Sequence, residues 1–236
     1  MEKPRLQHKQ SSDGLAIPVK SNQSNQLNDL KGTRLSRTQR GKQIALFRKK
    51  QITRAAYEII AEKGYFNFTM RDIAKRAGVS SGLIHHYFKD KENMLVSILR
   101  EMQEEIRTSA EKAIEEAADP KEKLDRFMNQ AFGLVEHQRQ YVYVTYDFLT
   151  QIKFNERMQR ILSKLYRGYR EMMMAILHEG KEKGSFRDVD EHYIASLFIS
   201  SMLGIQLQYI IDNTAFLYRE YTERIKNYIF ELVVLK

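Results

Sequence analysis

The chain has no cysteine among its 236 residues and contains only 3 prolines and 11 glycines. Without cysteine there is neither a disulfide framework nor a thiolate metal site, which fits a reducing cytoplasm. The scarcity of proline and glycine leaves few residues that would interrupt a long helix. No useful stretch alternates apolar and polar side chains, and the β-prone segment YVYVTYDFL at 141–149 lies among helical patterns. The sequence therefore predicts an all-α fold.

Motifs of catalysis and export are also missing. The chain has no G-x-S-x-G, Walker or G-x-G-x-x-G motif, and no apolar signal-peptide core near Met1. His85 and His86 are adjacent, so on a helix they point about 100° apart, and no third ligand stands at metal spacing. We therefore expect no enzyme activity, no cofactor and no bound metal.

Positive charge is concentrated in the first part of the chain. Residues 1–91 hold 19 Lys and Arg against 7 Asp and Glu, a net +12, whereas the remainder holds 20 against 23, a net −3. Such an asymmetry is typical of a DNA-binding module attached to a part that need not touch DNA.

Residues 1–40 are rich in Ser, Asn, Gln, Lys and Arg and show no apolar periodicity. We interpret them as a disordered basic arm. Such an arm adds phosphate affinity or reaches into a minor groove. A solvated tail, or a start codon assigned too far upstream, is the alternative.

The stretch from Thr69 to Lys91 is typical of two short helices joined by a tight turn. Thr69 and Asp72 have the spacing of a capping box. An apolar face follows at Met70, Ile73, Ala74 and Ala77. Gly78 suits a helix C-terminus, and Ser80 suits the N-cap of the next helix. The spacing predicts a helix-turn-helix.

The second helix, expected over 81–88, has an informative polarity. Ile84 and Phe88 lie one turn apart and can anchor it on the core. Its other positions carry side chains suited to base edges, phosphates and thymine methyls: Ser81, Gly82, Leu83, His85, His86 and Tyr87. The alternative is an ordinary αα-corner in which Leu83 and Tyr87 are buried.

Residues 44–95 resemble the DNA-binding domain of the TetR family of bacterial one-component transcriptional regulators. Its members typically read FAEKGY and then TxxxIAxxAGVSxGxxYxYFxxKxxL. This chain matches at 62–65, Thr69, 73–74, 77–80, Gly82, 87–88 and Lys91. The resemblance implies a three-helix DNA-binding domain at 41–92 that binds a double-stranded DNA operator.

The same resemblance implies roles for individual side chains. It gives phosphate contacts to Thr69, Arg71, Tyr87, Lys89 and Lys91. It gives base contacts to Ser81, Gly82, Leu83, His85 and His86, beside the capping Ser80. The family often has Lys at the position of Ser81 and Tyr at that of His85. These departures leave the operator sequence open.

The rest of the chain, 93–236, is expected to fold as a second helical domain. An uninterrupted helix of roughly 25 residues begins near Lys91 and ends before Asp119-Pro120. At 1.5 Å per residue it is a rigid lever of about 40 Å. Further helices are expected at about 120–138, 140–153, 155–182, 189–212 and 215–235.

The interior of this second domain is rich in aromatic and thioether side chains, which fill a core or line a cavity for an apolar or aromatic ligand. The resemblance implies a pocket for a small-molecule effector between about 91 and 182. Candidate lining residues are Met102, Phe127, Phe132, Tyr143, Tyr146, Tyr169 and Met173.

The segment 193–211 is apolar nearly all round and long enough to span a membrane. Ser and Gln within it, and acidic flanks without a Lys/Arg bias, argue against a membrane. A helix apolar all round must be covered on both sides, so we expect a homodimer interface. Candidate interface residues are Phe198, Met202, Ile205, Tyr221, Ile225 and Tyr228.

Together these features favour a cytoplasmic, homodimeric repressor that a small hydrophobic or aromatic ligand releases from a palindromic operator. A ligand-independent DNA-associated protein that recruits a divisome or nucleoid factor is the alternative. An activator with the same architecture is a third possibility. The sequence identifies neither the effector nor the regulated genes.

Overall fold

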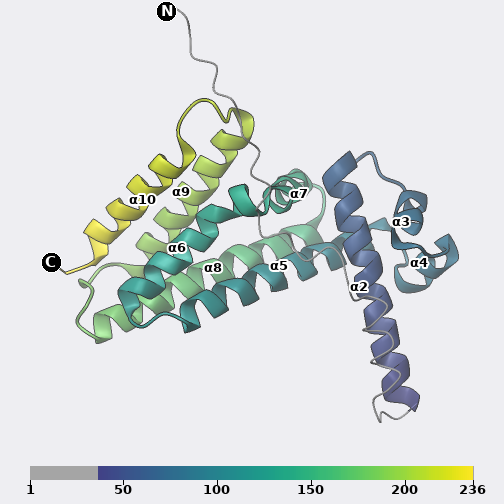
Figure 1. Cartoon of the computed structure of the whole chain (residues 1–236), viewed down its shortest axis with the longest axis horizontal. Helices are drawn as coiled ribbons and strands as arrows, with labels where there is room; N and C mark the ends of the chain where they lie inside the picture. The colour runs from purple at the N-terminus through teal and green to yellow at the C-terminus, as the bar shows by residue number, and fades with distance from the viewer. Residues whose placement is uncertain (1–36, 236) are drawn as a thin grey trace, which may run out of the picture. The chain divides into compact units, whose positions relative to one another are not determined.

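The computed structural model describes residues 37–235, and these fold entirely into helices and their connections (Figure 1). The helices are α2 (Arg37–Lys63), α3 (Met70–Ala77), α4 (Ser81–Tyr87), α5 (Lys91–Glu115), α6 (Pro120–His137), α7 (Arg139–Leu149), α8 (Glu156–Glu182), α9 (Glu191–Ile211) and α10 (Tyr218–Val233). The all-α prediction is confirmed, and 141–149 belongs to α7. Within the described residues, β-type pairing is limited to one isolated bridge between Phe186 and Val234.

Three expected boundaries differ from the observed ones by at least three residues, and one of them is the start of α10, at Tyr218 rather than near 215. Helix α2 begins at Arg37, so residues 37–40, which were assigned to the basic arm, are helical, and the rest of that arm lies outside the described residues. Helix α7 ends at Leu149 rather than 153, because residues 150–154 form successive turns. The chain divides into two units between Arg48 and Lys49, and the contacts described below lie within the second.

Three helices of the second domain begin with a side-chain capping bond. The side chains of Asp119, Asn155 and Asp190 accept hydrogen bonds from the backbone N–H groups of Glu122, Met158 and Tyr193, at 2.9, 3.0 and 3.0 Å. These bonds satisfy N–H groups that have no partner within the helix. Asp119, Asn155 and Asp190 therefore fix the starts of α6, α8 and α9.

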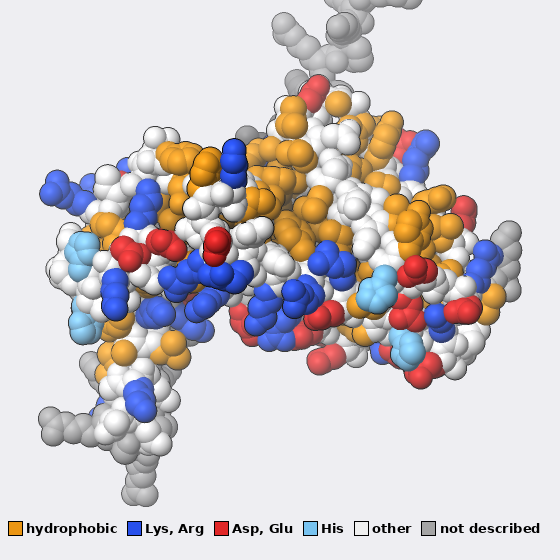
Figure 2. Space-filling view, turned by 180° about the vertical axis from the view of Figure 1, so that it is seen from behind, with side chains coloured by type: hydrophobic (Ala, Val, Ile, Leu, Met, Phe, Trp, Pro, Cys, Tyr) orange, Lys and Arg blue, Asp and Glu red, His pale blue; other side chains and the backbone are white. Residues whose placement is uncertain are grey.

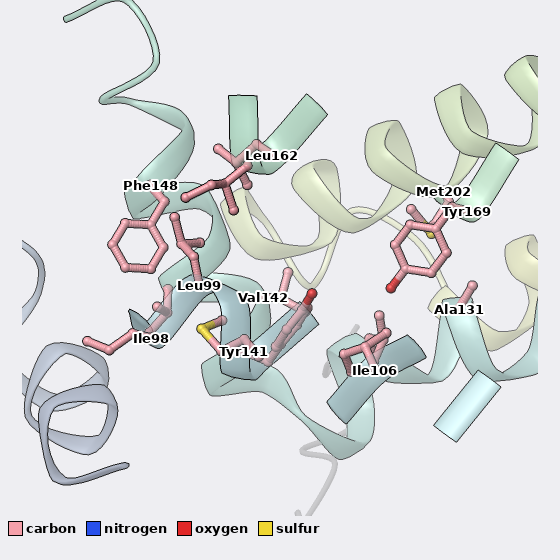
Figure 3. Close-up of a cluster of buried hydrophobic side chains, with 14 of the residues drawn as sticks. Ile98, Leu99, Ile106, Ala131, Tyr141, Val142, Phe148, Leu162, Tyr169 and Met202 are labelled. Atoms are coloured by element: carbon pink, nitrogen blue, oxygen red, sulfur yellow. The ribbon is translucent and has the colours of Figure 1, made fainter. Parts of the chain in front are cut away.

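The long helix α5 forms the centre of the packed core. It has 25 residues, about 37 Å at 1.5 Å per residue, and its buried side chains include Leu95, Ile98, Leu99 and Ile106. It packs along α6 and α8, as the parallel course of these helices in Figure 1 shows. Figure 3 shows Ile98, Leu99 and Ile106 among side chains of the neighbouring helices.

Helix α9 is long and apolar enough to cross a membrane by length and composition alone. One side of it packs on α8, α6 and α10, and its buried Gln206 donates a hydrogen bond to the Ala131 carbonyl of α6 at 2.9 Å. The other side is exposed, with Tyr193, Leu207 and Ile211 at 62%, 43% and 76% exposure. Helix α9 is therefore a core helix whose exposed side mixes these apolar side chains with Ser196, Ser200 and Gln208.

The burial of α9 changes the expected dimer surface. Phe198, Met202 and Ile205 are at most 6% exposed and pack in the chain's own core. Their assignment to a dimer interface is corrected, because the helical period turns them away from the exposed side. On α10, Tyr221 and Tyr228 are 48% and 55% exposed, as an interface would require.

Candidate functional site

The turn between α3 and α4 has the local geometry that its residues dictate. The Thr69 hydroxyl accepts a bond from the Asp72 N–H at 3.2 Å, while the Asp72 carboxylate accepts from the Thr69 N–H at 2.9 Å. Gly78 ends α3 with a φ of +64°, a left-handed conformation that glycine adopts without strain. The Ser80 hydroxyl then accepts from the Leu83 N–H at 3.2 Å and starts α4.

Ion pairs hold α3 against α2. Arg76 contacts Glu62 at 2.6 Å and Glu58 at 3.2 Å, and Lys63 contacts Asp72 at 2.7 Å. The bond from Lys63, together with those from Thr69, lowers the pKa of Asp72 to about 2. These pairs are solvent-exposed, so their main effect is to fix the orientation of α3 rather than to stabilise the fold.

Helix α4 is anchored by one side and open on the other. Ile84 and the capping Phe88 are 0% and 1% exposed. The outward residues Ser81, Gly82, His85 and His86 are exposed, while Leu83 and Tyr87 are half-buried. Residues 49–90, which contain α3 and α4, are called the head from here on. Figure 2 shows Lys, Arg and His side chains along its outer edge. The surface of α4 is therefore available for contact with another molecule.

The predicted phosphate-binding residues differ in their accessibility. Arg71 and Lys89 are exposed. The Thr69 hydroxyl is engaged in the cap of α3, and the Ser80 hydroxyl in that of α4. Lys91 turns inward: its Nζ donates to the Tyr65 carbonyl at 3.3 Å and lies 3.9 Å from the centre of the Phe68 ring. Burial accordingly lowers the pKa of Lys91.

The loop after α2 is joined to the helical body by contacts that the sequence did not reveal. The Tyr65 N–H donates to the Asp147 carboxylate of α7 at 3.1 Å, and the Tyr65 ring meets the Phe148 ring edge-on, 5.9 Å between centres. A second long-range bond lies within the helical body itself: Arg157 of α8 donates to the Asn93 side chain of α5 at 2.8 Å. No local pattern marks these residues, because Tyr65 and Asp147 are 82 positions apart.

A cavity lies between α6, α7, α8 and α9, with a volume of about 20 Å³. This is roughly the room that one water molecule needs. The lining residues are Leu134, Tyr141, Val142, Thr145, Tyr146, Leu165, Tyr166, Tyr169, Met202, Leu203 and Gln206. None carries a formal charge at neutral pH, so the cavity suits an apolar or neutral group.

The predicted pocket residues are only partly brought together here. Tyr146 and Tyr169 line the cavity. The other five do not line it: Met102, Phe127, Phe132 and Met173 are at most 5% exposed in the surrounding core, whereas Tyr143 is 39% exposed at the surface. Tyr141, Thr145 and Gln206 were missed, because their inward direction depends on helix packing.

Tyrosine hydroxyls are the main polar groups at the cavity. The Tyr146 hydroxyl donates to the Leu203 carbonyl at 3.1 Å. The Tyr169 hydroxyl is buried and has no hydrogen-bond partner among the described residues. Figure 3 shows the hydroxyls of Tyr141 and Tyr169 pointing into the same space from α7 and α8. Burial raises the pKa of Tyr166 to about 12 and that of Tyr169 well above its ordinary value, so both stay neutral.

Glu101 of α5 is an ionisable side chain held partly out of water. Burial, together with the nearby Glu105 carboxylate, raises the pKa of Glu101 to about 7, although Lys50 and Arg54 of α2 partly offset this. Between about pH 4.5 and pH 7 the folded chain therefore keeps a proton that the unfolded chain releases. The free energy of unfolding consequently falls as the pH rises through this window.

We expect Glu101→Gln to remove this fall and to raise the free energy of unfolding at pH 8 by roughly 2 kcal/mol. At pH 4.5 the substitution should change the free energy of unfolding much less, because Glu101 is then protonated in the folded chain and still half protonated in the unfolded one. Thermal unfolding at the two pH values measures the difference. Glu115→Gln, an exposed carboxylate on the same helix, is the control. An unchanged pH profile in Glu101→Gln would contradict the expectation.

Among the described residues, no group of three or more His, Asp or Glu side chains is arranged to hold a metal ion. Comparison with known proteins assigns the chain. Residues 52–98 match the family model of bacterial regulatory proteins of the tetR family, and residues 88–233 match the YsiA-like protein, C-terminal region. The chain belongs to the TetR family. Like other TetR-family proteins it is a helix-turn-helix transcriptional regulator, which is not an enzyme.

Curated TetR-family relatives share about a third of their aligned residues with this chain. The fatty acid metabolism regulator protein of Bacillus subtilis is 35% identical over 138 residues, which is 58% of this chain and 70% of the relative. The transcriptional regulator BetI of Agrobacterium fabrum is 33% identical over 131 residues, 56% of this chain and 64% of the relative.

Solved TetR-family structures superpose over most of the chain. The regulator FadR from Bacillus subtilis in complex with stearoyl-CoA has a TM-score of 0.65 and 26% identity, covering 76% of this chain and 96% of that structure. A regulator from Saccharomonospora viridis in complex with choline has a TM-score of 0.73 and 21% identity, covering 80% and 98%. The second likeness shows the fold alone.

Proposed function

We propose that this TetR-family protein is a cytoplasmic homodimeric repressor, released from a palindromic operator when the acyl chain of a long-chain acyl-CoA enters the cavity between α6 and α9. Residues 41–92 then form the DNA-binding domain, extended at its start by the first residues of α2. Residues 93–236 form the ligand-binding and dimerisation domain.

Two lines of support favour an acyl ligand over a charged one. The lining of the cavity carries no formal charge, and burying an unpaired charge there would be strongly unfavourable. The relative with the fatty acid metabolism name, and the structure of FadR with stearoyl-CoA, share more than a quarter of their aligned residues with this chain.

The observation that carries the proposal is that one helix, α7, contacts both the cavity and the loop before α3. Helix α7 supplies Tyr141, Thr145 and Tyr146 to the cavity. One residue further along, its Asp147 holds the loop that leads into α3. A cavity of about 20 Å³ must widen to admit an acyl chain, and any displacement of α7 on widening is passed to the head.

Homodimerisation is assigned to the exposed side of α9 and α10, the two helices that pack together near the C-terminus. Tyr193, Leu207 and Ile211 of α9 and the predicted Tyr221 and Tyr228 of α10 supply exposed apolar area, beside the half-buried Ile225. Such a face is stabilised when a second copy covers it. The dimer would place two α4 helices in successive major grooves, about one helical turn apart.

Operator binding with and without acyl-CoA tests the proposal. We expect DNase footprinting on the region upstream of the protein's own coding sequence to show a palindromic site that the protein protects from cleavage. Stearoyl-CoA should remove this protection. Coenzyme A alone is the control and should leave the footprint intact. A footprint that stearoyl-CoA, oleoyl-CoA and lauroyl-CoA all leave unchanged would instead favour the ligand-independent alternative.

The contacts of the head separate into specific and non-specific ones. We expect Lys89→Ala to weaken binding to all DNA sequences and to flatten its salt dependence, since one phosphate contact is lost. His85→Ala should relax discrimination between operator and unrelated DNA, by about 1–3 kcal/mol. Fluorescence anisotropy across a salt series measures both effects. Equal losses on specific and unrelated DNA in the two variants would refute the assignment.

Lys91→Ala is a matched comparison for Lys89→Ala. Because the Lys91 ammonium is bonded to the Tyr65 carbonyl, it should change the salt slope less than Lys89→Ala does. A larger change in salt slope for Lys91→Ala would show that the side chain turns outward when DNA binds.

A further inference from the structure

The Tyr169 hydroxyl is a buried polar group that faces the Tyr141 hydroxyl across the cavity. Its side chain is 6% exposed, and the oxygen has no hydrogen-bond partner among the described residues. An unsatisfied buried hydroxyl lowers stability, so such groups are uncommon unless something else supplies a partner. The hydroxyl points into the cavity, opposite that of Tyr141 (Figure 3).

Three other polar side chains at the cavity are engaged with backbone carbonyls of the protein. The Tyr146 hydroxyl donates to the Leu203 carbonyl, the Thr145 hydroxyl to the Tyr141 carbonyl, and the Gln206 amide to the Ala131 carbonyl. These bonds hold α7 and α9 in place and leave those donors committed. Tyr169 differs from these three, because its O–H has no backbone acceptor and can turn from the Tyr141 hydroxyl to a ligand.

The surroundings of Tyr169 define the chemistry of the group that it can bind. No carboxylate or ammonium lines the cavity, and burial keeps the tyrosine hydroxyl protonated because it raises the Tyr169 pKa. A neutral donor in an apolar site suits an uncharged acceptor such as a carbonyl oxygen. It cannot neutralise a phosphate or a carboxylate, so the charged part of an acyl-CoA must remain outside.

We propose that the Tyr169 hydroxyl is the hydrogen-bond donor that recognises the thioester carbonyl of the effector. This inference rests on the proposed acyl-CoA function and adds the residue and the ligand atom. It makes the regulator selective for acyl thioesters over alkyl chains of equal length. The apolar remainder of the cavity, including Leu165 and Met202, contacts the chain without distinguishing the two.

A ligand pair that differs at one oxygen tests this. Palmitoyl-CoA carries the thioester carbonyl, whereas the thioether S-hexadecyl-CoA has the same chain length and the same coenzyme without it. We expect the full-length dimer to bind palmitoyl-CoA about threefold to tenfold more tightly in isothermal titration, the worth of one neutral hydrogen bond. Tyr169→Phe should abolish this preference by weakening palmitoyl-CoA binding alone.

Two further measurements separate recognition from a structural role. Tyr166→Phe, a neighbouring cavity tyrosine on the same helix, should keep the preference. Without ligand, Tyr169→Phe should unfold at the same temperature as the unaltered protein or slightly higher, because it removes an unsatisfied buried group.

The outcomes are distinguishable. If neither ligand binds or releases the operator, the proposed acyl-CoA function fails, and this inference fails with it. If both ligands bind the unaltered protein equally, or if Tyr169→Phe retains the preference, only the assignment of Tyr169 is overturned. A lower unfolding temperature of ligand-free Tyr169→Phe would likewise overturn it, by showing that the hydroxyl has an internal partner.

Discussion

Asp147→Ala should leave a regulator that still binds its operator but no longer releases it. Coupling between two sites of a protein typically changes affinity by about 5–150-fold, and we expect this variant to reduce that factor to about one or two. The reason is that the Asp147 carboxylate is the acceptor through which α7 holds the Tyr65 N–H of the head. Without it, widening of the cavity no longer moves the loop before α3.

The measurement is operator affinity by fluorescence anisotropy, with and without saturating stearoyl-CoA, alongside titration of the ligand itself. Asp147→Asn keeps an acceptor oxygen and should retain most of the coupling. Glu171→Ala, an exposed carboxylate on α8, is the surface control and should behave like the unaltered protein. If Asp147→Ala still loses the operator on ligand addition by the unaltered factor, coupling runs through another contact.

Gly180→Ala should destabilise the fold by roughly 2–4 kcal/mol. A Cβ added at Gly180 would lie 2.0 Å from one carbon of the Phe186 ring and within 2.5 Å of two more. The ring therefore has to leave its place, where it is 3% exposed. Phe186 also forms the bridge to Val234, so the C-terminal end of α10 should loosen together with the loop after α8.

Gly168→Ala, in the same helix, provides the matched control. A Cβ there meets nothing within 4 Å. Replacing glycine by alanine inside a helix then stabilises by about 0.5–1 kcal/mol. Thermal unfolding should separate the two variants by roughly 5–20 °C, since about 1 kcal/mol shifts the midpoint of a chain of this size by about 2–4 °C. Equal midpoints would show that the Phe186 ring can move aside without loss.

The local parts of the DNA-binding head could be predicted because the signals for them are contained within a few residues. The capping box at Thr69, the left-handed Gly78 and the cap at Ser80 each act over three or four positions, and the structure has all three. The start of α2 could not be found in this way, because the residues before Ile44 are polar and lack apolar periodicity.

Side-chain direction was predictable only where a helix has one clearly apolar side. Helix α9 is apolar nearly all round, so periodicity could not tell which side meets the core, and Phe198, Met202 and Ile205 were assigned to the wrong side. For the same reason the predicted pocket list includes the core residues Phe127 and Met173. An aromatic side chain satisfies both a core and a cavity, and only packing distinguishes them.

The sequence by itself determined the all-α fold, the helix-turn-helix from Thr69 to Lys91 and the outward residues of α4, because each depends on neighbours along the chain. The tertiary structure decided which way Lys91 points, which tyrosines meet at the cavity and how Asp147 reaches the loop at Tyr65. These features join helices that are far apart in sequence. Their contacts are set by the packing of whole helices, which no short stretch of residues specifies.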